Sequence, residues 1–266
     1  MKVKADGQTV REVERYAAVR QYSFAQILAV WSAAAIPMAV LAWVVAPLLG
    51  ALLGGGDVTF IKALLLCILA GLIWQFVLVM LLVHQERGSL RWSVLKDALW
   101  LHSPRSPRTG RVGGRLWLVL IPFVLLFAAE GAIPFLSVIP PVASHDANVF
   151  VQSDAGQEFM SGNWVWFAVI VALFVFNTVL GEELLFRGVL LPRMKGAFGR
   201  WDWAANGVLF ALYHLHMPWV IPETLLIDTF VEAYPSRRYR SALIGIIVHT
   251  IPSIVVLALV LTLVLQ

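Results

Sequence analysis

The amino-acid sequence predicts an all-α fold, a polytopic transmembrane helical bundle of about seven spans. Three observations predict it. Of the residues, 60% are hydrophobic and only 14% are charged, against about 45–50% and about 25% in soluble globular proteins. The mean hydropathy is +0.81, and apolar runs exceed twenty residues. A soluble globular protein and a disulfide-stabilised secreted domain are therefore excluded, the latter because Cys67 is the only cysteine.

The first elements are an arm and four apolar runs. Residues 1–25 mix basic and acidic side chains and lack the apolar stretch of a signal peptide, so we expect an arm outside the membrane. At ~1.5 Å per residue, each apolar run is long enough to cross a hydrocarbon core of ~30 Å. The runs cover residues 26–49, 59–83, 116–139 and 164–186. Residues 26–160 are thus expected to form an N-terminal transmembrane part.

The charges of the connecting segments predict the orientation of the spans. Segments 84–115 and 187–200 carry seven and four Lys or Arg residues, whereas 50–58 and 140–163 carry none. Basic loops stay in the cytoplasm, so we expect the N-terminal arm there too. The net charge of +4 reflects this pattern, and no basic face indicates nucleic acid as a partner. The predicted partner of the apolar surface is the lipid bilayer.

The C-terminal stretch is less regular, because charged residues interrupt it before a last apolar run, 241–265. If the chain goes out as residues 203–217, turns near Pro218 and returns as 219–234, the arginines that follow stay in the cytoplasm. The number of spans is then seven. The returning segment contains the acids Glu223, Asp228 and Glu232. Such a segment suits a position buried among other helices, or a re-entrant one.

Ionisable side chains inside the apolar runs are the candidate functional residues, because each costs ~2.5 kcal/mol or more in hydrocarbon. They are Glu130, Glu182, Glu183, Arg187, His214, His216 and His249. Glu183 and Arg187 are four residues apart on one helical face, which favours an ion pair. Glu182 points about 100° away and keeps a free carboxylate. The structural alternative is a charged cluster at the end of a helix.

The depths of three of these groups in the membrane agree. Counted from the expected cytoplasmic ends of their segments, Glu182, His214 and His249 lie at depths of roughly 15, 18 and 12 Å. A carboxylate and two imidazoles in one dry layer are suited to activating a water molecule and stabilising an oxyanion. Each histidine alone would more often be a hydrogen-bonded packing residue.

Three motifs carry a family resemblance. They are Glu182-Glu183 with Arg187, Phe210 with His214, and His249 with Ser253. In order and spacing they resemble Glu-Glu-x-x-x-Arg, Phe-x-x-x-His and His-x-x-x-Asn or Asp of the CAAX prenyl protease and bacteriocin-processing (CPBP or Abi) family of intramembrane glutamic proteases. The resemblance covers about residues 164–262, so 161–266 is the expected catalytic core.

The resemblance implies hydrolysis of a peptide bond in a membrane-associated or prenylated substrate. Glu182 is then the general base, His214 holds the attacking water and His249 donates to the oxyanion. Glu183, Arg187 and Phe210 have supporting places in the motifs. Ser253 departs from the Asn or Asp of the family and offers one donor instead of two. Pro252 before it should kink the last helix.

The resemblance implies no cofactor, but the residues leave other chemistry open. Two histidines and a glutamate could bind zinc, although no His-Glu-x-x-His motif occurs. His249 and Ser253 could form a serine dyad, but no Gly-x-Ser-x-Gly accompanies them. Gly54-Gly55-Gly56-Asp57 matches a motif of aspartyl intramembrane proteases, but it lies in an expected external turn without a partner aspartate.

Two other classes of function also remain open. One is a catalytically weak or inactive membrane scaffold or bacteriocin self-immunity protein, which would keep the fold. Ser253, in place of the Asn or Asp of the family, favours this class. A proton-coupled transporter would use Glu130, Glu182 and the histidines as a relay. Fifteen Arg against five Lys indicates a GC-rich bacterial genome, so the expected location is a bacterial cell membrane.

Overall fold

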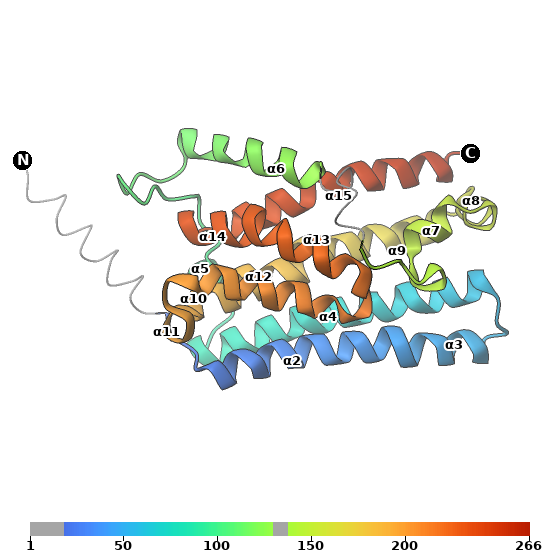
Figure 1. The fold of residues 1–266 in the computed structure, drawn as a ribbon, viewed down its shortest axis with the longest axis horizontal. Helices are drawn as coiled ribbons and strands as arrows, with labels where there is room; N and C mark the ends of the chain where they lie inside the picture. Colours follow the sequence, from blue (N-terminus) through green and yellow to red (C-terminus); the bar gives the residue numbers. More distant parts are fainter. Residues whose placement is uncertain (1–18, 130–137) are drawn as a thin grey trace, which may run out of the picture.

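The computed structural model describes residues 19–129 and 138–266, and all regular elements in these ranges are helical. The prediction of an all-α bundle is therefore confirmed. Four helices are long and apolar enough to cross a membrane: Phe24–Leu52, Asp57–Arg87, Trp164–Arg193 and Ala242–Val264. Figure 1 shows them running along the long axis of the bundle. Three of the first four predicted apolar runs, 26–49, 59–83 and 164–186, correspond to these helices, and so does the last run, 241–265.

Two of these spans, the first and the third, contain wider π-helical turns. The first consists of α2 (Phe24–Val40), η1 (Leu41–Val45) and α3 (Ala46–Leu52), and the second is the single helix α4 (Asp57–Arg87). The third consists of α9 (Trp164–Val175), η6 (Phe176–Gly181), η7 (Leu184–Leu190) and α10 (Leu191–Arg193). The fourth is α15 (Ala242–Val264), and η1, η6 and η7 are the π-helical parts.

The predicted run 116–139 is only partly described. It begins in η2 (Gly114–Val119) and continues as α6 (Leu120–Ala128), a shorter apolar helix beside α15. The rest of the run, with Glu130, extends into 130–137, which lie outside the described residues. The other short elements are α5 (Trp92–Ala98), η5 (Ala143–His145), α7 (Ala147–Gln152), α8 (Asp154–Met160), α11 (Lys195–Phe198) and η8 (Gly199–Trp201).

Residues 202–239 form a helical hairpin rather than two spans. Its outgoing arm is α12 (Asp202–Tyr213) with η9 (His214–His216), and its returning arm contains η10 (Pro218–Val220), α13 (Ile221–Leu226), η11 (Thr229–Ala233) and α14 (Tyr234–Tyr239). An ion pair between Asp202 and Arg237 joins the two ends. The turn near Pro218 is thus confirmed.

The length of the hairpin does not support seven spans. The outgoing arm, with 12 residues in α12 and three in η9, covers about 24 Å, short of the ~30 Å of a hydrocarbon core. In Figure 1 the hairpin turns back before it reaches the far end of α4. The structure therefore favours the re-entrant form of this segment, and the predicted number of seven spans is not confirmed.

Backbone carbonyl groups of the outgoing arm of the hairpin receive hydrogen bonds from the first span, one within α12 and one at the tip in η9. Nε1 of Trp31 donates to the carbonyl oxygen of Leu209 at 2.7 Å, and Nε1 of Trp43 donates to that of Leu215 at 2.8 Å. Carbonyl groups at a helix C-terminus lack intrahelical partners, and in hydrocarbon they need a donor from another element. The indole of Trp43 therefore satisfies a carbonyl group where the arm ends inside the bundle, and the indole of Trp31 attaches α12 to the first span.

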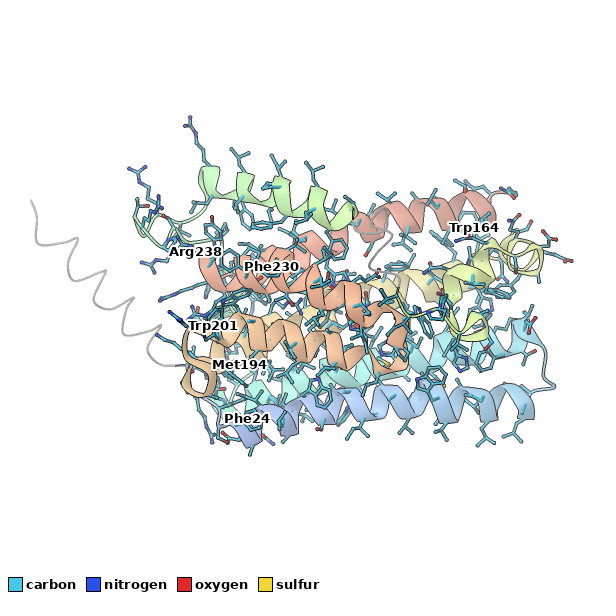
Figure 2. The ribbon with its side chains drawn as sticks, in the orientation of Figure 1. Phe24, Trp164, Met194, Trp201, Phe230 and Arg238 are labelled. Carbon is cyan, nitrogen blue, oxygen red and sulfur yellow. The ribbon has the colours of Figure 1, made fainter. Side chains whose placement is uncertain are left out.

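The basic segments gather at one end of the bundle. Arg193 pairs with Glu86, and the backbone N–H of Arg105 donates to the carbonyl oxygen of Tyr239. Figure 2 shows Arg238 and Trp201 at this end, and Trp164 at the opposite end. Both tryptophans are more than half exposed, as expected for anchors at the two membrane interfaces.

Candidate active site

The two consecutive acids of the third span lie between the π-helical segments η6 and η7, and both side chains are buried. A π-helical turn widens the backbone and redirects the side chains beside it, and such turns are frequent at functional sites. A Cβ atom on Gly181 would lie 3.1 Å from the carbonyl oxygen of Leu72, so the glycine lets α4 approach just before Glu182. The two carboxylates then face different neighbours.

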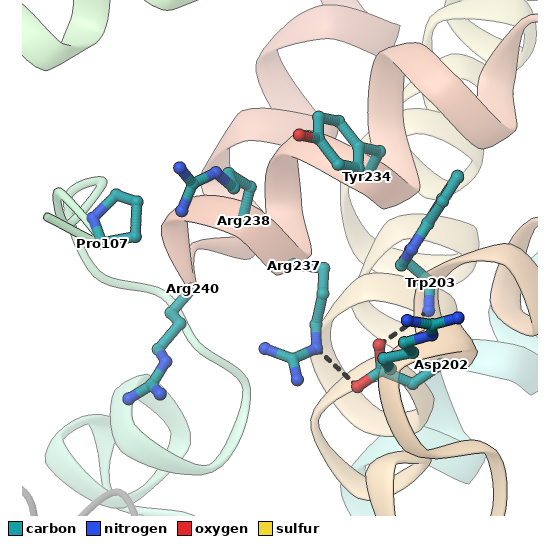
Figure 3. Close-up of a pocket in the computed structure, with 8 residues that line it drawn as sticks. Pro107, Asp202, Trp203, Tyr234, Arg237, Arg238 and Arg240 are labelled. Atoms are coloured by element: carbon teal, nitrogen blue, oxygen red, sulfur yellow. Dashed lines mark hydrogen bonds and ion pairs between the residues drawn. The ribbon is translucent and has the colours of Figure 1, made fainter.

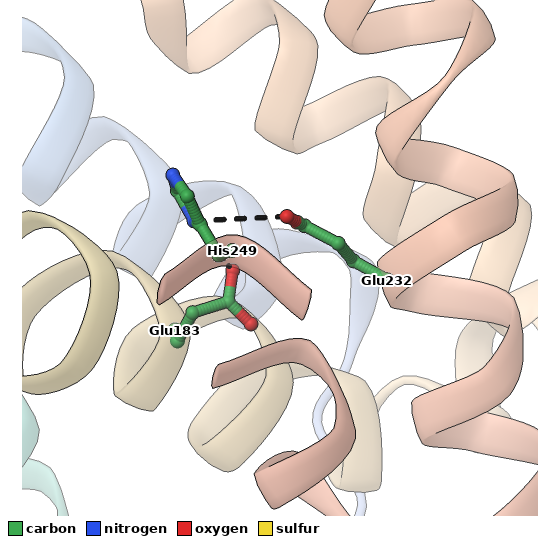
Figure 4. A group of neighbouring side chains, drawn as sticks. All are labelled: Glu183, Glu232 and His249. Carbon is green, nitrogen blue, oxygen red and sulfur yellow. Dashed lines mark hydrogen bonds and ion pairs between the residues drawn. The ribbon is translucent and has the colours of Figure 1, made fainter. Parts of the chain in front are cut away.

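Glu183 and Arg187 form a buried ion pair, with 3.5 Å between Oε2 and Nε, as their spacing predicts. Arg187 makes a second ion pair with Glu232 of η11. Nδ1 of His249 lies 3.5 Å from Oε1 of Glu183 and 3.6 Å from Oε1 of Glu232 (Figure 4). We call Glu183, Arg187, Glu232 and His249 the buried charge cluster.

Glu232 is a member of this cluster that sequence reasoning did not include among the site residues. Its side chain is fully buried, and it comes from the returning arm of the hairpin. Gly207 permits this placement, because a Cβ atom there would collide with Thr229 of the same arm. The sequence feature that could have identified Glu232 is its acidic side chain in the returning segment, which was expected to be buried among other helices.

Gly245 brings α15 close to the cluster, one helical turn before His249. A Cβ atom on Gly245 would lie 3.0 Å from Cγ of Arg187 and 3.2 Å from Oγ of Ser236, and would collide with the carboxylate of Glu183. The backbone N–H of Gly245 also donates to Oγ of Ser236 at 3.1 Å. Only glycine therefore lets the last helix approach the third span this closely.

Glu182 faces away from the cluster, toward α12. Its side chain is 1% exposed and interacts with the hydroxyl group of Tyr213. The Tyr213 hydroxyl also accepts a hydrogen bond from Nε2 of Gln75 at 2.6 Å. Oε2 of Glu182 is buried and has no hydrogen-bond partner among the described residues. An unpaired buried carboxylate oxygen is costly, so it is a candidate to receive a proton or a water hydrogen.

Tyr213 and Gln75 were not among the predicted site residues. Gln75 lies in the middle of a predicted span, where an amide among apolar residues was the signal that could have found it, and its side chain is fully buried. Tyr213 directly precedes His214 in the second motif, but the direction of the Tyr213 side chain depends on how the hairpin packs against the spans.

The orientation of His214 fixes the role of its second nitrogen. Nδ1 lies 3.0 Å from the carbonyl oxygen of Phe210. A carbonyl oxygen can only accept, so Nδ1 carries the hydrogen, and in the neutral ring Nε2 carries the lone pair. His216 stacks on this ring at a centroid distance of 5.5 Å. Nε2 of His214 is thus suited to accept a hydrogen bond from water.

Phe210 lies at the centre of the predicted site. Its ring is 4.9 Å from that of His214 and 6.5 Å from that of His249, between centroids, and the Arg187 guanidinium lies 4.0 Å from its centre. His249 also interacts electrostatically with Glu182 and with His214. The structure therefore brings His214 and His249 to the ring of Phe210, and Glu182 interacts with one of these two histidines, His249.

Ser253 lies one turn after His249 in α15, which includes Pro252. Its hydroxyl donates to the carbonyl oxygen of His249 at 2.9 Å. The hydrogen of Ser253 is thus directed at the backbone of its own helix. In this arrangement the hydroxyl adds no donor to the layer of Glu182.

The buried charge cluster also contains the best candidate for a metal site among the described residues. The ligand atoms of Glu183, Glu232 and His249 lie within 4.8 Å of one another. However, the guanidinium of Arg187 contacts both carboxylates, so a divalent cation would lie against a fixed positive charge. These residues fit a metal ion poorly. They are also not the set considered from the sequence, which was Glu182 with two histidines.

Comparison with known proteins agrees with the motifs. Residues 163–255 match a family model described as type II CAAX prenyl endopeptidase Rce1-like. The matched stretch contains every predicted site residue from Glu182 to Ser253, and the resemblance inferred from the motifs is confirmed. No curated protein and no solved structure matches the chain.

Proposed function

We propose that the protein is an intramembrane endopeptidase that hydrolyses a peptide bond of a membrane-associated or prenylated substrate with water activated by Glu182. The observation that carries this proposal is the buried carboxylate of Glu182, whose Oε2 is unpaired among the described residues and which interacts with His249. The match to a family of CAAX prenyl endopeptidases supports the same class of reaction.

In the proposed mechanism, one hydrogen of the attacking water goes to Glu182 and the other is held by Nε2 of His214. The water oxygen bonds to the carbonyl carbon of the scissile peptide, and the carbonyl oxygen becomes an oxyanion. When the C–N bond breaks, Glu182 returns its proton to the leaving amine, so the carboxylate is regenerated. The Tyr213 hydroxyl, which contacts Glu182, keeps the carboxylate in place.

The oxyanion needs a hydrogen-bond donor, and Nε2 of His249 supplies it in this proposal. A carboxylate can only accept, so Nδ1 of His249 carries a hydrogen toward Glu183 and Glu232. When Nε2 is protonated as well, the four groups of the buried charge cluster carry no net charge. Glu183, Arg187 and Glu232 are therefore positioning residues, which act through His249.

We further propose that the reaction needs no metal ion, because the cation of the cluster is the guanidinium of Arg187. The bilayer and a peptide or membrane-protein substrate are the expected partners. The basic end of the bundle would face the cytoplasm of a bacterial cell, together with the N-terminal arm.

A second candidate function is a catalytically inactive membrane scaffold or self-immunity protein. The hydrogen bond of Ser253 within its own helix favours it, because losing one oxyanion donor can cost ~10²–10³ in turnover. Substitution of Glu182 distinguishes the two, since a scaffold would tolerate it.

The proposal is tested by incubating the purified protein with a membrane proteome and identifying cleavage products by mass spectrometry. Wild type, Glu182→Gln and the control Glu223→Gln are compared, each with and without a chelator. Glu223 is a carboxylate of the hairpin outside the buried charge cluster. We expect the products to disappear in Glu182→Gln alone and to persist with chelator. Identical products from all three proteins would contradict the protease proposal.

A further inference from the structure

We propose that a cavity at the basic end of the bundle binds the phosphate group of an anionic lipid. This cavity has a volume of about 300 Å³ and lies where the two ends of the hairpin meet the segment around Pro107 (Figure 3). Its lining consists of Pro107, Arg200, Asp202, Trp203, Tyr234, Arg237, Arg238 and Arg240. We call it the arginine cavity. It is separate from the buried charge cluster, and the proposal does not depend on peptidase activity.

The charges of the lining select an anion. Four arginines and one acid face this cavity, so its net formal charge is +3. Both oxygens of Asp202 are already engaged, since Oδ1 accepts from the backbone N–H of Trp203 at 2.9 Å and Oδ2 pairs with Arg237. Asp202 therefore pairs with Arg237, and three further guanidinium groups line the cavity. Arginine forms paired hydrogen bonds with phosphate oxygens, which makes phosphate the matching ligand.

The backbone of Arg240 supports a binding role for its side chain. Arg240 ends α14 with φ +49°, a left-handed conformation that glycine adopts with less strain. The chain nevertheless carries an arginine there, and its side chain lines the cavity. Hydrogen bonds from Arg105 to the carbonyl of Tyr239, and from Ala242 to that of Trp100, fix the backbone on both sides. This wall of the cavity is therefore preformed.

The surroundings favour a lipid over soluble phosphate. Trp203 packs against Tyr234 and Phe230, with ring centroids 5.2 and 5.6 Å apart. Phe230 and Trp201 are each more than half exposed. Tryptophan and tyrosine side chains prefer the depth of lipid headgroups, and basic cavities on the cytoplasmic side of helical bundles bind anionic headgroups. A lipid can place its phosphate in the cavity and its acyl chains along the apolar surface of the hairpin.

The test measures lipid retained by the full-length protein in native mass spectrometry, after exchange into equal amounts of phosphatidylglycerol and phosphatidylcholine. The variant Arg238→Gln/Arg240→Gln removes two charges from the arginine cavity. The matched control Arg111→Gln/Arg115→Gln removes two charges from a second cavity of about 580 Å³, formed by residues 106–116. We expect wild type and control to prefer phosphatidylglycerol by roughly tenfold, and the cavity variant to lose that preference.

Two outcomes would overturn the proposal. One is an unchanged preference in the cavity variant. The other is equal protection from thermal unfolding by inorganic phosphate and by phosphatidylglycerol at the same phosphate concentration, which would make this a site for the free anion. A melting temperature of the double variant below that of the wild type in phosphatidylcholine would show that the double substitution destabilises the fold. In that case the single variant Arg238→Gln replaces it, because the Arg238 side chain is exposed, and the same two outcomes apply to it.

Discussion

The guanidinium group of Arg187 contacts the carboxylate of Glu232 in the interior of the bundle, where both side chains are fully buried. The two residues belong to the third span and to the hairpin, so this ion pair ties the hairpin to the helix that carries Glu182. Removing Glu232 leaves the Arg187 guanidinium with one carboxylate, that of Glu183, whereas removing Arg187 leaves both carboxylates without it.

The first prediction concerns this pair. We expect Glu232→Leu to lower the free energy of unfolding by about 3–5 kcal/mol, because Arg187 loses one of its two carboxylates. Arg187→Leu should be less stable than that single variant, because it leaves the buried carboxylates of both Glu183 and Glu232 without their guanidinium partner. Unfolding in detergent measures both, with Glu223→Leu as the control. Equal melting of Glu232→Leu and wild type would show that the pair adds nothing to stability.

The second prediction concerns the close approach of α15. The methyl group of Gly245→Ala would displace the carboxylate of Glu183 and the side chain of Arg187, at a cost of about 1–3 kcal/mol. We expect lower stability and slower turnover, since His249 follows on the same helix. Ala258→Leu, an enlargement at an exposed position of α15, should change neither. A Gly245→Ala protein with wild-type melting and kcat would contradict this packing.

The third prediction concerns Ser253. Because its hydroxyl donates to the carbonyl oxygen of His249, Ser253→Ala should change kcat by less than about threefold. Ser253→Asn, which introduces the residue of the related proteases, should raise kcat by about tenfold or more if its amide reaches the oxyanion. Steady-state kinetics measures both. Loss of activity in Ser253→Ala would instead assign a direct role to the hydroxyl.

The fourth prediction concerns metal ions. Since Arg187 already contacts the carboxylates of Glu183 and Glu232, we expect activity to survive dialysis against a chelator. Metal content measured on the dialysed, active protein should be far below one ion per chain. Loss of activity on dialysis, with recovery on adding zinc, would show that the activity depends on a zinc ion.

Apolar runs were a reliable guide to the spans because crossing a bilayer depends mainly on length and hydropathy. The run 59–83 and the last run correspond to α4 and α15 for that reason. Residues 203–234 were predicted to form two further spans, and the structure does not confirm them. An apolar segment that ends inside the bundle has the composition of a span, and only its tertiary contacts, such as the hydrogen bond from Trp43 to the carbonyl oxygen of Leu215, show that it stops there.

The candidate active site likewise contains residues that the sequence predicts and residues that it does not. The pairing of Glu183 with Arg187 follows from helical spacing, so the sequence alone predicts it. Glu232 and Tyr213 depend on how the hairpin packs against the third span, which no spacing along the chain encodes. Gln75 escaped notice because an amide in an apolar run is less conspicuous than a charge, although it is fully buried beside Tyr213.

The central claim is that the carboxylate of Glu182 activates the attacking water. It is tested most directly by cleavage rates of one identified substrate in vesicles that contain wild type, Glu182→Gln or the control Glu223→Gln at equal amounts. A glutamine keeps the size of the side chain but cannot take a proton. We expect kcat to fall by about 10²–10⁴ in Glu182→Gln, with unchanged melting temperature and a normal rate in Glu223→Gln. A Glu182→Gln protein that cleaves at the wild-type rate would contradict the claim.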